Sequence, residues 1–216
     1  MAKKMQDLLI EELSDVYSAE RQITQALPKL AKAAASADLR TAFESHLEET
    51  KGQIKRLDRI FSLLKTQPEE KECKAMKGLA EEADELLKED LAPEVLDAAL
   101  IAAAQKVEHY EIASYGSLRA YADACGLDEV ADLLGQTLAE EKATDEKLNG
   151  LAVAEINPRA VERSAAWGAE GGGDRDPRPG FVSDARGFLH GGLFESRQRG
   201  FGPLEGLGGR GPVLSL

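Results

Sequence analysis

The sequence predicts an all-α protein organised as a four-helix bundle. Apolar residues recur at three- and four-residue steps through most of residues 1–158, which is the period of a helix packed on one face. Four of these segments are long, and a shorter one lies between the second and the third. The alternation of apolar and polar residues that is typical of a β-strand is missing from this part of the sequence.

The first two long helices are expected at residues 5–34 and 36–65. Within the first, Pro28 is expected to kink the helix or to end its regular part, because proline removes a backbone donor. Ser36 or Asp38 can cap the second helix by accepting a hydrogen bond from a backbone N–H of its first turn. A short loop joins antiparallel neighbours, so the pair should form a helical hairpin.

The second half of the bundle repeats this arrangement. After the break "TQPEE", a short amphipathic helix is expected at residues 73–90. Pro93 is suited to open the third long helix, and Gly126 to close it. The fourth, residues 127–156, should run to a stop at Asn157-Pro158. Two hairpins joined by a long crossover with a short extra helix have the layout of a ferritin-like four-helix bundle.

The composition changes sharply near residue 158. Residues 1–158 contain 14 lysines and 5 arginines, whereas residues 159–216 contain no lysine and 8 arginines. The same C-terminal stretch holds 14 of the 20 glycines, and glycine-rich chains lose much backbone entropy on ordering. We therefore expect a helical bundle at 1–158 and a disordered, Gly/Arg/Pro-rich tail at 159–216.

Charge and cysteine content restrict the partners and the compartment. The formal charge of −12 argues against nucleic acid or an anionic membrane as partner, since both favour basic surfaces, and it attracts cations. Two cysteines, Cys73 and Cys125, are too few for a disulfide framework, so a cytoplasmic setting is the simplest fit. No apolar run approaches the roughly 18 residues of a membrane helix, and we expect no signal peptide.

Several carboxylates lie on the apolar faces of the predicted helices. Glu20 and Glu141 each occupy the centre of such a face. Glu108 and Glu111 compete for one role on a helix that is apolar over much of its circumference. An ionised carboxylate buried without a partner costs several kcal/mol or more, so something should neutralise these groups.

The two hairpins carry these polar residues in matching positions. In each hairpin 33 residues separate the acid of the first helix from a polar residue of the second, Glu20 to Gln53 and Glu108 to Glu141. A further polar residue lies one turn away on each second helix, Glu49 and Asp145, and residues four apart share a helix face. Oxygen-rich clusters inside a bundle suit hard cations, which predicts a dinuclear iron or manganese centre.

Simpler interpretations compete at each position. A single Glu near an apolar stripe is commonly a boundary residue whose carboxylate reaches water, and Glu49 is the weakest candidate because it lies off the stripe centre. His46 is interpreted as a polar neighbour of the site rather than a ligand, and His109 is expected to point away from the apolar face. Three tyrosines lie one turn from the acids, where core packing is commoner than hydrogen bonding or electron transfer: Tyr17, Tyr110 and Tyr115.

Five stretches carry a family resemblance: "DLLIEELSDVYSAERQI", "FESHLEETKGQIKRLDRIF", "CKAMKGL", "AAAQKVEHYEIASYGSLRAYA" and "LGQTLAEEKATDEKL". They resemble the YciE/YciF-type ferritin-like family of bacterial stress proteins over about residues 5–158. The resemblance implies a ferritin-like bundle, often dimeric, with a dinuclear metal site. Its motif positions fall on the following residues: Glu20, Glu49, Gln53, Glu108, Glu111, Glu141 and Asp145.

The sequence departs from the Glu-x-x-His pairs of ferritins and rubrerythrins. Gln53 and Asp145 stand in the partner places, at a spacing of four and with no histidine there. An oxygen-rich site of this kind should favour manganese or weakly held iron over zinc or copper.

Two functions follow as alternatives. In the first, a stress-associated protein uses the metal centre to react with oxygen or peroxide; Glu20, Glu49, Glu108 and Glu141 are ligands, and Gln53 and Asp145 complete or orient the set. In the second, the protein is a non-enzymatic helical scaffold or dimerising stress protein, and any metal is structural. An iron-storing cage is disfavoured, because nothing in the sequence marks a many-subunit interface.

Overall fold

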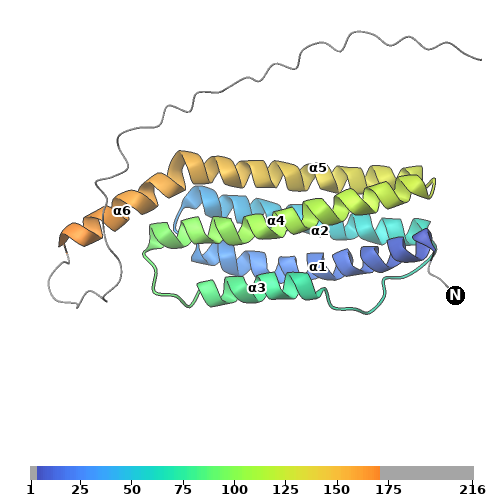
Figure 1. Ribbon diagram of the computed structural model, residues 1–216, viewed down its shortest axis with the longest axis horizontal. Helices are drawn as coiled ribbons and strands as arrows, with labels where there is room; N and C mark the ends of the chain where they lie inside the picture. The colour runs from blue at the N-terminus through green and yellow to red at the C-terminus, as the bar shows by residue number, and fades with distance from the viewer. Residues whose placement is uncertain (1–3, 171–216) are drawn as a thin grey trace, which may run out of the picture. The chain divides into compact units, whose positions relative to one another are not determined.

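The computed structural model describes residues 4–170, and of residues 164–170 it describes the backbone only. Every element in this range is helical, as predicted (Figure 1). The elements are α1 (Met5–Ala33), α2 (Ala37–Leu63), α3 (Lys74–Leu86), α4 (Pro93–Ala124), α5 (Asp128–Leu151), a π-helical turn η1 (Ala152–Ile156) and α6 (Asn157–Glu170). None of the helices in this range is both long enough and apolar enough to cross a bilayer.

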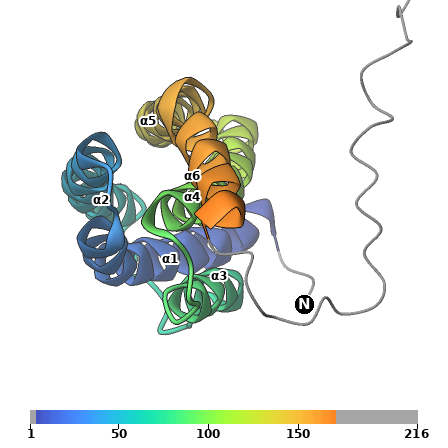
Figure 2. The ribbon, with the colours of Figure 1, turned by 90° about the vertical axis from the view of Figure 1, so that its left-hand side faces the viewer.

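The long helices form two hairpins, as the sequence predicts. Helix α1 packs along α2, α4 packs along α5, and the hairpins meet through α1 with α4 and α2 with α5. Figure 2 looks along the bundle and shows the four long helices around a shared interior, with α3 outside them against α1. The fold is a ferritin-like four-helix bundle with a short extra helix in the crossover.

Local signals in the sequence set several of the helix ends. Ser36 caps α2, because its Oγ accepts a hydrogen bond from the Leu39 N–H at 3.3 Å. Pro93 is the first residue of α4. Gly126 follows that helix with a φ of +68°, a left-handed conformation in which glycine carries no Cβ penalty. Helix α1 continues through Pro28 to Ala33, so this proline does not end it.

The predicted helix stop at Asn157-Pro158 is wrong. The chain continues from α5 through η1 into α6, which reaches Glu170 and packs against α4. The Asn157 N–H donates to the Ala152 carbonyl five residues back, and Pro158 then falls in the first turn of α6, where a missing N–H breaks no bond of that helix. The predicted tail therefore starts as a helix, and its residues 171–216 lie outside the described part of the chain.

The core divides into two hydrophobic clusters with a polar layer between them. One cluster includes Ile23, Phe43, Leu100 and Leu148, and the other includes Leu13, Leu57, Leu118 and Leu134. Apart from Ser14 on α1 and Asp97 on α4, the buried polar residues of the long helices lie between the two clusters: Glu20 on α1, His46, Thr50 and Gln53 on α2, Glu108 and Glu111 on α4, and Thr137, Glu141 and Thr144 on α5. Helix packing thus brings the polar residues of separate segments to one level.

A buried carboxylate ties the α1–α2 turn to α4. Asp97 is 3% exposed, and its two oxygens accept hydrogen bonds from the backbone N–H groups of Ala35 and Ser36, each at 2.8 Å. Because Ser36 is the cap of α2, this contact holds the start of α2 in the first hairpin against the first turns of α4 in the second.

We predict that Asp97→Ala lowers the free energy of unfolding by about 2–4 kcal/mol, because two hydrogen bonds to a charged group are lost. Asp97→Asn keeps one acceptor oxygen and should lose about half as much. Urea unfolding measures both, with Asp123→Ala at an exposed position of α4 as the control. A loss in Asp97→Ala no larger than the control's would contradict the prediction.

Candidate metal centre

Six side chains of the polar layer, from all four long helices, carry carboxylate, imidazole or amide groups that could bind or orient a metal. None is more than 3% exposed: Glu20 from α1, His46 and Gln53 from α2, Glu108 and Glu111 from α4, and Glu141 from α5. Both Glu108 and Glu111 are buried in the layer. Helix α4 is apolar around much of its circumference, which lets two of its faces be buried.

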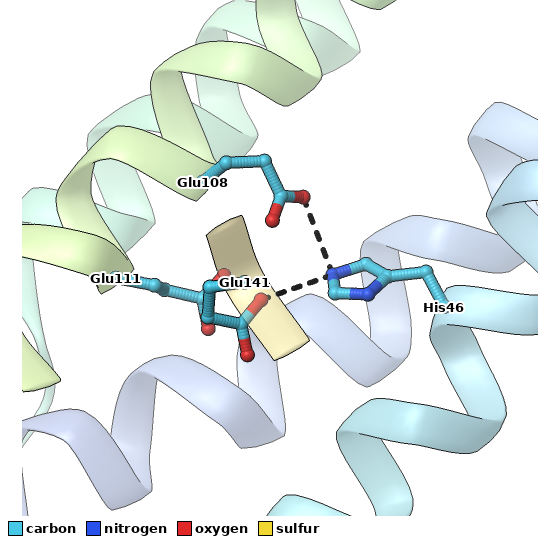
Figure 3. Close-up of side chains that lie close together, drawn as sticks. All are labelled: His46, Glu108, Glu111 and Glu141. Carbon is cyan, nitrogen blue, oxygen red and sulfur yellow. Dashed lines mark ion pairs between the residues drawn. The ribbon is translucent and has the colours of Figure 1, made fainter. Parts of the chain in front are cut away.

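Four of these residues make a compact set of ligand atoms. His46, Glu108, Glu111 and Glu141 each offer one atom, and the four atoms lie within 4.8 Å of one another. Figure 3 shows the imidazole of His46 directed at the acids, with Nε2 3.3 Å from Glu108 Oε1 and 3.9 Å from Glu141 Oε2. Ligands of a first-row metal lie about 2.0–2.3 Å from it, so atoms this close together are within reach of a shared cation.

Each of the four glutamates buried in the layer also keeps an oxygen without a hydrogen-bond partner. The unpaired atoms are Oε2 of Glu20, Glu108, Glu111 and Glu141, together with His46 Nε2 and Gln53 Oε1. Buried polar atoms are rarely left unpaired in native proteins, and a bound ion is one common partner for those that lack a hydrogen bond. A set of carboxylate oxygens with one imidazole fits iron or manganese, whereas zinc and copper favour sites richer in nitrogen and sulfur.

Burial is the largest influence on the pKa values of the acids in the layer. Burial raises the pKa of Glu20, Glu108 and Glu111 well above the usual range of a glutamate, and the charges of the neighbouring acids raise it further. Burial also raises the pKa of Glu141, although the adjacent His46 opposes this. Without a cation the raised pKa values favour the protonated form of these carboxyl groups, and a cation that binds here must displace the protons they hold.

Hydrogen bonds hold two of the acids in place. The Gln53 Nε2 amide donates to Glu141 Oε1, and also to Glu140 Oε2 at 3.2 Å. The hydroxyl of Tyr115 donates to Glu20 Oε1, and the ring is fully buried. Such contacts fix the orientation of a metal-binding carboxylate before any ion arrives.

Two of the residues predicted from sequence lie at the edge of the layer. The side chain of Glu49 is 45% exposed, and its carboxylate lies 3.5 Å from His46 Nδ1. Asp145 is 25% exposed and lies 3.1 Å from His109 Nε2. His109 itself is 70% exposed, in agreement with its predicted direction. Neither Glu49 nor Asp145 belongs to the compact set.

The helical pattern assigned His46 a supporting role, whereas the structure brings its Nε2 into the compact set. The available signal was its position seven residues, or two turns, before Gln53 on the same helix face. The three tyrosines differ in their hydrogen-bond partners. Tyr115 contacts Glu20, whereas Tyr17 donates to Asp58 at 3.0 Å and Tyr110 to Asp15 at 2.8 Å, outside the layer.

We predict that the metal-free protein loses stability as the pH rises from about 5 to 8. The folded state retains protons that the unfolded chain releases above a pKa of 4.5, so the free energy of unfolding falls with pH, by up to about 1.4 kcal/mol per pH unit for each acid. Glu111→Gln, which cannot ionise, should flatten this slope and raise stability at the upper end.

Urea unfolding in the presence of a chelator measures the slope, and Glu146→Gln at an exposed position of α5 is the matched control. A free energy of unfolding that is flat or increases over this range would contradict the prediction.

Comparisons with known proteins agree with the fold and the resemblance. The family described as "Domain of unknown function (DUF892)" matches residues 4–161. Protein YciF of Escherichia coli (strain K12) is 51% identical over 163 residues, which are 75% of this chain and 98% of YciF.

Solved structures give the same result. The crystal structure of the E. coli stress protein YciF aligns with a TM-score of 0.70 at 52% identity, over 72% of this chain and 99% of that one. YcfI from Rhodopseudomonas palustris aligns with a TM-score of 0.66 at 50% identity, over 68% and 94% of the two chains. Ferritin-like, diiron-carboxylate proteins from Bacillus anthracis share the fold, with a TM-score of 0.55 at 17% identity over 70% and 99%. The chain therefore belongs to the DUF892 family, as a YciF-type ferritin-like protein.

Proposed function

We propose that this protein is a stress-associated, ferritin-like protein that binds a dinuclear iron or manganese centre inside its bundle. The observation that carries the proposal is the set of four buried ligand atoms within 4.8 Å of one another, surrounded by carboxylate oxygens that lack hydrogen-bond partners. Two comparisons support it: the E. coli relative is described as a stress protein, and the Bacillus anthracis proteins of the same fold are described as diiron-carboxylate proteins.

The proposed ligands are Glu20, Glu108, Glu111, Glu141 and His46. Gln53 and Tyr115 orient two of these acids through the hydrogen bonds described above. Glu49 and Asp145 remain in the proposal as residues at the solvent side of the centre. In support of this, the charge of Asp145 is one cause of the raised pKa of Glu108, and the contact with His46 lowers the pKa of Glu49.

A bound pair of Fe(II) ions would supply two electrons, one from each ion, which with two protons reduce dioxygen to hydrogen peroxide. The chain's own residues do the rest. The hydrophobic clusters on either side exclude water from the layer, and the acids release their protons as cations enter. We further propose a cytoplasmic homodimer, and light scattering after size exclusion tests the dimer. The net charge of −12 supports the absence of nucleic-acid and anionic-membrane partners.

A structural role for the metal is the second candidate. The six side chains of the layer come from all four long helices, so an ion bound among them would cross-link the bundle. In that case the protein is a non-enzymatic scaffold, and metal binding adds to the free energy of folding without redox chemistry.

We predict that anaerobic titration of the metal-free protein with Fe(II) gives about two ions per chain, as a dinuclear site requires. Glu141→Ala should weaken binding by at least about 100-fold, because loss of a neighbour of a ligand alone costs 10- to 100-fold. Glu146→Ala, on the exposed face of the same helix, should bind as the unchanged protein does. Equal binding by both variants would refute the proposed centre.

Addition of oxygen or peroxide to the iron-loaded protein separates the two candidates. A redox centre should give a near-ultraviolet band from Fe(III) that Glu141→Ala lacks. A structural centre should raise the melting temperature on metal binding, in proportion to its affinity, and show no oxidation above that of free Fe(II). The same titration with Mn(II) identifies the preferred ion.

A further inference from the structure

An apolar pocket lies against the candidate metal centre, between α1, α3 and α4. Apolar residues make almost all of its wall, among them Ile23, Leu27, Met76, Leu79, Ala104 and Val107. His46 and Glu108, two members of the compact ligand set, also line it, and Gln22 is the one other polar lining residue. The pocket therefore connects the short crossover helix to one side of the centre.

The size of the pocket limits what it can hold. It offers about 30 Å³ to the centres of water-sized molecules. One such molecule needs roughly 10–15 Å³, so the pocket accepts about two or three of them. This is enough for a diatomic molecule and too little for an organic substrate, which occupies pockets of about 300 Å³ or more.

The chemistry of the wall decides between the small molecules that fit. Apolar cavities in proteins stay dry and bind apolar guests such as xenon, because water there would give up hydrogen bonds that the wall cannot replace. Hydrogen peroxide, with two O–H donors, carries the same penalty as water. Dioxygen has no hydrogen bonds to lose, so its transfer from water into the pocket is favourable.

A second pocket that includes His46 lies between α2 and α5 and has a mixed lining. Its wall combines the charged and polar residues Glu49, Glu140, Thr144 and Lys147 with the apolar residues Ala42, Ala143 and Leu148. The two pockets share His46 and no other residue. The α2–α5 pocket thus offers more hydrogen-bonding groups to a hydrated solute than the pocket on the α3 side does.

We propose that the pocket between α1, α3 and α4 is a binding site for dioxygen that delivers it to the His46–Glu108 side of the centre. Delivery rests on the proposed function, since it requires a metal that reacts with dioxygen. Binding of dioxygen in the pocket does not depend on the proposed function, because the pocket is formed by the polypeptide alone. The substrate that this geometry selects is therefore dioxygen and not peroxide.

The binding step is tested on the full, metal-free chain by methyl NMR under oxygen pressure. Dioxygen is paramagnetic, so it should raise the relaxation rates of the Ile23 and Met76 methyl groups severalfold more than that of Ile60. Ile60 is the matched control, because it is equally buried but belongs to the other hydrophobic cluster. Equal enhancement at Ile23 and Ile60 would overturn the proposal, and this comparison requires no variant.

The delivery step is tested with a substitution that fills the pocket. Ala80 lines it from α3, away from the ligand helices, and Ala80→Leu should abolish the enhancement at Ile23. Ala75→Leu, at an exposed position of α3, should leave the enhancement unchanged. In the iron-loaded protein, Ala80→Leu should slow oxidation by dioxygen severalfold while the rate with peroxide and the number of bound irons stay the same.

The outcomes separate failure of this inference from failure of the proposed function. Absence of iron binding in the unchanged protein would refute the centre and with it delivery, whereas the NMR comparison would still decide whether the pocket binds dioxygen. Normal iron binding with equal rates of oxidation by dioxygen in Ala80→Leu and Ala75→Leu would overturn delivery alone.

Discussion

Burial of four carboxyl groups in one bundle interior is the constraint around which the rest of the molecule is arranged. Glu20, Glu108, Glu111 and Glu141 come from three helices and share a layer that water does not reach. Four negative charges at this separation in a medium of low dielectric cannot coexist unaided, so the layer is either protonated or occupied by cations. Each state has its own charge and proton count, and this couples the folding of the bundle to the metal and proton content of its surroundings.

An ion pair at the edge of the layer, between Arg56 and Glu140, fixes the direction of the Gln53 amide. The guanidinium of Arg56 binds both oxygens of Glu140, at 2.9 and 2.7 Å, and Thr137 at 2.6 Å. Glu140, fixed in this way, accepts a hydrogen bond from the amide of Gln53, whose second contact is with Glu141. The amide nitrogen of Gln53 is therefore directed at the two acids of α5. This partly buried ion pair thus orients Glu141 through the neutral side chain of Gln53, and the charge of Arg56 also lowers the pKa of Glu20 directly.

The helical period predicted the bundle, the hairpins and the inward direction of Glu20, Glu108, Glu111 and Glu141, because a single helix determines which of its own residues face the core. It did not predict the membership of the site, which depends on the neighbours of each helix. His46 lies at the edge of its own stripe, and it becomes buried because Thr144 of α5 and Glu108 of α4 enclose its ring. Glu49, one turn further along α2, faces solvent instead. The stop predicted at Pro158 failed for a local reason, since a π-helical turn places that proline where its missing donor is tolerated.

That π-helical turn also bears on how the chain can change in evolution. A π turn accommodates more residues than an α-helical turn, so the residues after it are rotated about the axis relative to an uninterrupted helix. Helix α5 thus keeps the rotation that buries Glu141 and Leu148, and α6 packs against α4. Insertions or replacements after Ile156 therefore leave the phase of the carboxylate-bearing helix untouched.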